Sequence, residues 1–172
     1  ALAIYPSVVQ SNILEASLYP GILTRLAELR RKSTDEFNAM LGDYSEKIHD
    51  KIYSVSRYPD LITTDGENGM RVSGSSYPDS VKDAASYLIE NHSDILTRLE
   101  KIESSVQQDL TDILSMYPKE TDKAYRFLLN YPAALIVMYQ NLELTSLIGD
   151  YYRQSPLEFA RNFEDYGAAI AE

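Results

Sequence analysis

Apolar residues recur at intervals of three and four along most of this 172-residue chain, which is the spacing of one face of an α-helix. No stretch has a comparably convincing strand pattern. Glycine is sparse, and three of its seven copies fall in one stretch, so residues 63–76 are predicted to form a Gly-rich loop. The pattern therefore predicts an all-α fold. Its clearest stripe consists of Ile95, Leu99, Ile102, Val106, Leu110, Ile113 and Tyr117.

Proline indicates where these helices begin, because six of the seven prolines directly follow a tyrosine. A residue before proline is pushed out of the helical backbone region, whereas proline itself suits a first helical turn. Each pair is predicted to end one helix and start another, with the tyrosine ring closing the end of the core. The alternative role for these rings is stacking against a ligand. The pairs are Tyr5-Pro6, Tyr19-Pro20, Tyr58-Pro59, Tyr77-Pro78, Tyr117-Pro118 and Tyr131-Pro132.

The length allows one domain, or at most two small halves, and we predict a single compact domain of about seven helices over residues 1–172. Two long intervals between Tyr-Pro corners share a plan of a short helix, a serine-led cap and a longer helix, which predicts two quasi-repeated helical hairpins. The serine is Ser33 in the capping-box sequence of residues 33–36, and Ser93 in the second interval. The predicted helices cover residues 6–18, 20–31, 34–57, 78–91, 94–116, 118–151 with a break at 131–132, and 155–170.

Acidic residues outnumber basic ones by 26 to 16, which gives a formal net charge of −10. This balance argues against nucleic acid and anionic lipid as partners, because both are bound through clustered cations. The only basic cluster, Arg30-Arg31-Lys32, is expected at a helix C-terminus, where cations offset the helix dipole. The longest apolar run, residues 133–139, is far shorter than the roughly 20 residues that cross a bilayer. We therefore expect no nucleic-acid partner and no membrane span.

Most recognisable catalytic sites are also excluded. The chain has no cysteine, so it has no disulfide, no thiolate metal site and no cysteine nucleophile. Glu46 and His49 have the spacing of one half of a di-iron carboxylate site, but the second Glu-x-x-His is missing and His92 lacks a glutamate at that spacing. We expect neither a metal nor another cofactor. Among the many carboxylates, Glu143 and Asp150 are the leading candidates for acid–base catalysis, since the rest of their helix is largely apolar.

Both ends of the chain resemble an uncharacterised family of bacterial exported proteins, a domain of unknown function with paired Tyr-Pro corners and an Asn-Tyr-Pro helix. The residues that carry the resemblance are Tyr5-Pro6, Ile13-Leu14, Ala16-Ser17 and Tyr19-Pro20 near the start, and Asn130-Tyr131-Pro132, Asn141-Leu142, Thr145 and Gly149-Asp150 near the end. The chain departs from that pattern at Ser7, where the family tends to carry aspartate, and at Leu144, where it tends to carry tryptophan. The resemblance implies an extracytoplasmic location, periplasmic or envelope-associated, after removal of a signal peptide. It implies no reaction.

The same resemblance selects candidate site residues. Asn130, Asn141 and Thr145 lie on or beside one helix, and the last two are four residues apart on one face. Buried polar groups need hydrogen-bond partners, so these residues form either a buried network between the C-terminal helices or the floor of a polar cleft. Tyr5, Tyr19 and Tyr131 are the candidate binding residues at the corners.

We expect the chain to be a non-enzymatic interaction domain of the bacterial envelope that binds a protein or an envelope polymer through a tyrosine-rich surface. Tyrosine supplies a large, rigid contact area with a polar tip, and the usual catalytic constellations are missing. The alternative is a carboxylate-based hydrolase acting on envelope glycan or peptide, which needs two acids about 5 to 9.5 Å apart with one in an apolar setting. The oligomeric state is left open.

Overall fold

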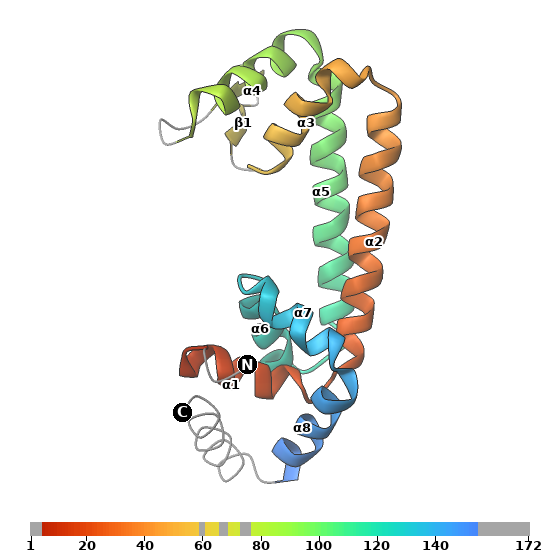
Figure 1. Ribbon diagram of the computed structural model, residues 1–172, viewed down its shortest axis with the longest axis vertical. Coiled ribbons are helices and arrows are strands. Elements are labelled where there is room, and N and C mark those ends of the chain that lie inside the picture. Colours follow the sequence, from red (N-terminus) through yellow and green to blue (C-terminus); the bar gives the residue numbers. More distant parts are fainter. Residues whose placement is uncertain (1–4, 59–60, 66–68, 73–76, 155–172) are drawn as a thin grey trace. The chain divides into compact units, whose positions relative to one another are not determined.

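The computed structural model describes residues 5–58, 61–65, 69–72 and 77–154 (Figure 1). Over these residues the fold is all-α, as predicted, with eight α-helices, one short 3-10 helix and one β-hairpin. The chain divides into two compact units: the terminal unit, residues 1–29 and 109–172, and the central unit, residues 30–108. The elements are α1 (Ser7–Ala16), α2 (Gly21–Gly42), η2 (Glu46–Ile48), α3 (His49–Ser56), β1 (Ile62–Asp65), β2 (Gly69–Val72), α4 (Asp79–Asn91), α5 (Ser93–Leu114), α6 (Lys119–Leu128), α7 (Pro132–Gln140) and α8 (Leu142–Gln154).

Tyr-Pro pairs lie at the starts of helices, which confirms the prediction from the sequence. Pro6, Pro78 and Pro118 are the N-cap residues of α1, α4 and α6, and Pro132 is the first residue of α7. Pro20 directly precedes α2. Proline suits these positions because its fixed φ, about −65°, is allowed both at a non-helical N-cap and in the first turn, and because N–H groups at a helix start have no intrahelical partner.

The tyrosines of these corners pack against one another. In the terminal unit the rings of Tyr19 and Tyr117 meet edge to face, with centroids 5.4 Å apart. In the central unit Tyr58 and Tyr77 meet in the same way at 5.3 Å. Tyr58 lies two residues beyond the end of α3, and the proline that follows it is outside the described residues. Each pair therefore joins two corners that are separate in the sequence, and such ring pairs add about 0.5–1.5 kcal/mol beyond the area that they bury.

α2 is longer than predicted, because it continues without a break through residues 33–36. The predicted capping box at Ser33 and the predicted helix end at Arg30-Arg31-Lys32 are therefore both wrong. Serine and threonine cap a helix only where the backbone leaves the helical conformation. Residues 30–36 contain no apolar side chain, but apolar residues pack on both sides of them, Leu26 and Leu29 before and Phe37, Met40 and Leu41 after, and the helix continues between these packed ends.

The chain turns after Gly42 instead, so the predicted helix over residues 34–57 is interrupted. The imidazole Nε2 of His49 donates to the carbonyl oxygens of Leu41 (2.8 Å) and Tyr44 (3.0 Å), which ties the start of α3 to the end of α2 and to the turn that follows it. The two intervals predicted as related hairpins consequently differ. One has a 22-residue helix before an eight-residue helix, whereas the other has 13 residues before 22.

Part of the predicted loop at residues 63–76 is a β-hairpin. β1 and β2 pair antiparallel, with Ile62 opposite Val72 and Asp65 opposite Gly69. Thr63 and Thr64 are β-branched and favour extended backbone. The prediction of a loop was based on the glycines of this stretch and gave these threonines no weight. Residues 66–68 and 73–76 lie outside the described part of the chain, as does the predicted helix at 155–170.

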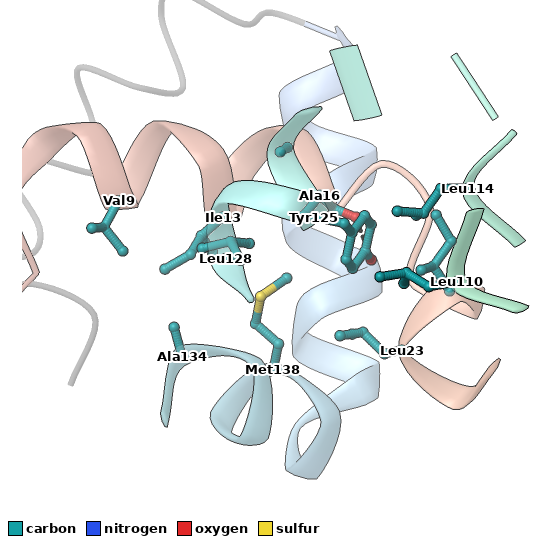
Figure 2. Close-up of a cluster of buried hydrophobic side chains, with 12 residues drawn as sticks. Val9, Ile13, Ala16, Leu23, Leu110, Leu114, Tyr125, Leu128, Ala134 and Met138 are labelled. Carbon is teal, nitrogen blue, oxygen red and sulfur yellow. Dashed lines mark hydrogen bonds between the residues drawn. The ribbon is translucent and has the colours of Figure 1, made fainter. Parts of the chain in front are cut away.

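Each unit has its own apolar core. In the central unit α3 packs against α4, and the fully buried residues include Ile52, Leu61 and Leu88. In the terminal unit α1 packs against α6, with contributions from the start of α2, the end of α5 and α7. Figure 2 shows this second core, where Ile13 and Leu128 are among the fully buried side chains.

Tyr125 of α6 is the largest fully buried side chain of the terminal unit, and its hydroxyl group points to the end of α1. The hydroxyl donates to the carbonyl oxygens of Ala16 and Tyr19, each 2.9 Å away. These carbonyls belong to the α1–α2 corner, residues 16–20, where the backbone leaves one helix before the next begins. Each of these carbonyls also accepts a turn bond, from the N–H groups of Tyr19 and Ile22 respectively, so Tyr125 adds a second donor and ties α6 to the corner.

Replacing Tyr125 with phenylalanine is expected to lower the free energy of unfolding by about 0.5–1.5 kcal/mol, because the hydroxyl's bonds to the two carbonyls are lost while their backbone bonds remain. Burial, with a smaller effect of Tyr117, raises the pKa of Tyr125 above its ordinary value of 10.0. Above that pH the unfolded chain releases the proton while the folded chain keeps it, so the wild-type chain loses about 1.4 kcal/mol per pH unit from this group. The stability difference between wild type and Tyr125→Phe is therefore full below pH 10 and shrinks above it.

Urea unfolding between about pH 7 and about pH 11 measures both effects. Tyr139→Phe is the matched control, since Tyr139 is exposed on α7 and its stability change is expected to be small at every pH. Equal stability of Tyr125→Phe and wild type at neutral pH would contradict the role given to the hydroxyl.

Two buried threonines make a second matched pair. Thr121 is fully buried in α6, and its Oγ1 has no hydrogen-bond partner among the described residues. Thr145 is buried in α8, and its Oγ1 donates to the carbonyl oxygen of Met138 at 2.9 Å. Valine has nearly the same shape, so Thr121→Val is expected to raise the free energy of unfolding by about 1 kcal/mol and Thr145→Val to lower it by about as much. Thermal or urea unfolding measures the stability change of each variant. A loss of stability in both variants would show that Thr121 has a partner.

Candidate interaction surface

α8 lies against the α1–α2 corner through a glycine. A Cβ atom built on Gly149 would lie 1.9 Å from the carbonyl oxygen of Ser17 and 2.6 Å from its carbonyl carbon. Both are backbone atoms, so no side-chain rotation could relieve the overlap. Glycine is therefore required here for the close approach of α8 to the corner, although it is an unfavourable residue inside a helix.

Other residues on the same side of α8 bond to α1 and its corner. Arg153 donates from Nη2 to the carbonyl oxygen of Leu18 at 2.7 Å, and its guanidinium lies 5.8 Å from the centre of the Tyr19 ring. The hydroxyl of Tyr152 hydrogen-bonds to the carboxylate of Glu15, and burial followed by the charge of Glu15 raises the pKa of that phenol. This inner side of α8 is consequently held by backbone contact, by hydrogen bonds and by ring contact.

The outer side of α8 carries large apolar residues. Leu144, Leu147 and Tyr151 are 54, 50 and 54% exposed. Their spacing of three and four residues places them within about 60° of one another around the helix axis, and we call them the α8 stripe. On the adjacent α7, Ile136 and Tyr139 are also exposed. Surface apolar residues are ordinary when scattered, but a row of them along one helix is typical of a binding surface.

Glu143 and Asp150, the predicted catalytic candidates, are both exposed on α8. Seven residues separate them, which places their Cα atoms about 10 Å apart on one edge of the helix. Neither lies in the apolar setting that a general acid needs near neutral pH. Their position instead makes them the charged border of the α8 stripe.

The predicted polar residues are not brought together. Asn130 and Asn141 are exposed, and the Nδ2 of Asn141 donates to the carbonyl oxygen of Val137 at 2.9 Å. Thr145 is buried and bonds to Met138, as described above. The side chains of Asn141 and Thr145 therefore each donate to a carbonyl in the last turn of α7, where the chain bends into α8. They do not bond to one another, although the backbone N–H of Thr145 donates to the carbonyl oxygen of Asn141 at 2.8 Å.

The predicted tyrosines Tyr5, Tyr19 and Tyr131 are half-buried and pack against the core of the terminal unit. Tyr131 stacks on the ring of Phe127 with centroids 5.3 Å apart. Tyr19 contacts Tyr117 and Arg153. These contacts fit the structural role expected for corner tyrosines, and among the described residues of this unit the exposed tyrosines are Tyr139 and Tyr151 instead.

A second polar group lies in the central unit around Tyr44. The hydroxyl of Tyr44 donates to Asp94 at 2.6 Å and accepts from Arg98 at 3.3 Å, while Arg98 also pairs with Asp43 at 2.9 Å. Burial and the bond to Asp94 raise the pKa of Tyr44, and the same bond lowers the pKa of Asp94. The ring of His92 contacts that of Tyr44. These bonds join the turn after α2 to the start of α5.

Within the described residues no group of three or more histidine, cysteine, aspartate or glutamate side chains could hold a metal ion. No helix in this part of the chain is long and apolar enough to cross a membrane. Comparison of the chain with models of protein families, with curated proteins and with solved structures gives no match. The case for a function therefore depends on the surface chemistry.

Sequence reasoning missed Leu147 and Tyr151 as surface residues and Gly149 as a contact residue. One signal was present: Thr145 and Gly149 are four apart and small, whereas large apolar residues lie on the other side of the same helix. A helix that packs through small residues and keeps large apolar ones elsewhere indicates a second contact surface. Leu144 was noted only as a departure from the resembled family.

Gly149→Ala is expected to lower the free energy of unfolding by about 1–3 kcal/mol, because the new Cβ overlaps the backbone of Ser17. The loss is expected despite the better helix propensity of alanine, which is worth about 1 kcal/mol. Gly42→Ala is the matched control. A Cβ there meets nothing within 4 Å, so no loss is expected. Urea unfolding of the two variants tests the close contact, and equal stabilities would contradict it.

Proposed function

We propose that this chain is a non-enzymatic interaction domain that binds a protein partner through the α8 stripe. The observation that carries the proposal is the contrast between the two sides of α8. Its inner side is fixed to the α1–α2 corner by Gly149 and Arg153, while its outer side presents Leu144, Leu147 and Tyr151 to solvent.

Physical chemistry supports a binding role for such a surface. Covering the exposed part of a leucine or tyrosine removes apolar area from water at about 25 cal/mol per Å². Tyrosine is also enriched among the residues that dominate binding energy, since it is large, rigid and polar at one end. Because the inner side already fixes the helix, little ordering is needed when a partner binds.

The proposal keeps the surface-binding idea from the sequence but moves it from the corner tyrosines to α8. A protein is favoured over a glycan because the stripe is mainly aliphatic, whereas sugar rings are bound by aromatic faces and hydrogen-bonding groups together. The bacterial envelope as its location remains part of the proposal and rests on the resemblance of the chain ends.

Binding is tested with the purified full chain as bait for the soluble and envelope fractions of the source cells, followed by a titration of the captured protein. Leu144→Ser combined with Leu147→Ser is expected to weaken binding at least tenfold. Only about half of each leucine is exposed before binding, so covering each is worth about half of the 1.5–3 kcal/mol of a full side chain, and the two together exceed 1.4 kcal/mol.

Val8→Ser is the matched control. Val8 is 51% exposed, close to the 50% of Leu147, but it lies on α1 and not in the α8 stripe. The Val8→Ser variant is therefore expected to bind as tightly as wild type. The proposal is wrong if no protein binds saturably, or if the double variant binds as tightly as wild type while both remain folded by circular dichroism.

A further inference from the structure

The apolar stripe of α8 is bordered by negative charge. Glu143 and Asp150 are seven residues apart, so they lie two turns apart along one edge of the α8 stripe. Both are exposed, and the described residues contain no ion pair with either of them. Their charges are therefore available to a partner that covers Leu144, Leu147 and Tyr151.

No free positive charge on α7 or α8 balances this acidic border. α7 has no charged residue, and Arg153 is the only cation of α8. Arg153 is occupied at the α1–α2 corner, where it donates to the carbonyl oxygen of Leu18 and lies over the ring of Tyr19. The surface around the α8 stripe is consequently apolar in the middle and acidic at its edge.

We infer that the partner supplies an amphipathic helix whose apolar face covers the α8 stripe and whose flank carries lysine or arginine opposite Glu143 and Asp150. This inference rests on the proposed function and names the class of partner. A helix fits because the stripe is a row with spacing i, i+3 and i+7, and such a row packs between the side-chain rows of a second helix. Basic residues fit because they would pair with two carboxylates that are otherwise unbalanced.

The same charges disfavour two other occupants. A second copy of the chain would bring its own Glu143 and Asp150 to the same surface, and like charges across an interface are unfavourable. Residues 155–172, which lie outside the described part, contain four acidic residues and one arginine, so they carry the same sign of charge. A separate basic partner is the occupant that the charge pattern favours.

Two model peptides test this directly. Each has about 18 residues, or five helical turns, and the same leucine face, but one has lysine and the other glutamate on its polar side. Fluorescence anisotropy with the full chain is expected to show at least tenfold tighter binding of the lysine peptide. Leu144→Ser with Leu147→Ser is expected to abolish this binding, and Glu143→Gln with Asp150→Asn to remove most of the preference for lysine.

Glu100→Gln with Glu103→Gln is the matched control, because it makes the same charge change at exposed positions of α5. An equal effect of this control would mean unspecific attraction to an acidic protein and would overturn the inference. Equal binding of both peptides, with loss in the leucine variant, would overturn the basic partner and leave the proposed function standing. Binding of neither peptide would overturn the helical partner, while the proposed function is judged by the capture experiment.

Self-association is distinguished by sedimentation velocity of the free chain. A dimer that dissociates in Leu144→Ser with Leu147→Ser would assign the α8 stripe to a second copy and overturn the inference. A monomer at the concentrations of the binding experiment is the expected result.

Discussion

The terminal unit depends on the side chains that bond to the backbone of the α1–α2 corner. Where α1 ends and α2 begins, the carbonyls of Ala16 and Tyr19 accept turn bonds from the backbone. The buried hydroxyl of Tyr125 donates to the same two carbonyls from α6, and Arg153 donates to that of Leu18 from α8. Gly149 lets the backbone of α8 touch the same corner. Two elements far from the corner in the sequence, α6 and α8, are therefore positioned by one short segment of backbone, through hydrogen bonds that contribute about 0.5–1.5 kcal/mol each.

This arrangement determines which side of α8 is available for binding. Contacts with the corner use Gly149, Tyr152 and Arg153, so the opposite side must face away from it. That side carries Leu144, Leu147 and Tyr151, which a helix serving only the core would bury or replace with polar residues. Under the proposed function the two sides of this helix have different tasks: small and polar groups fix it, and large apolar groups bind the partner. In the inference drawn from that proposal, the acidic border favours a partner with positive charge.

Features that depend on local backbone rules were predictable from the sequence. The Tyr-Pro corners and α5 could be located because proline geometry and helical periodicity act within a few residues. The length of α2 was not, because Ser33 carries a capping signal that packing on both sides of it overrides. The hairpin was obscured by the glycines beside Thr63 and Thr64. The α8 stripe was missed for a different reason: its residues are apolar, which suggests burial, and the small residues Thr145 and Gly149 that mark the covered side are recognisable as such only through their tertiary contacts.

The central claim is that the free chain exposes the α8 stripe, and hydroxyl-radical footprinting of the free, monomeric protein tests it most directly. Tyr151 is expected to be oxidised about as fast as Tyr53, which is exposed in the central unit, whereas Tyr125 is expected to be protected. Leu147 is expected to react as an exposed leucine. Protection of Tyr151 and Leu147 to the level of Tyr125 would mean that the stripe is covered in the free chain, and it would contradict the claim that α8 is held ready to bind a partner.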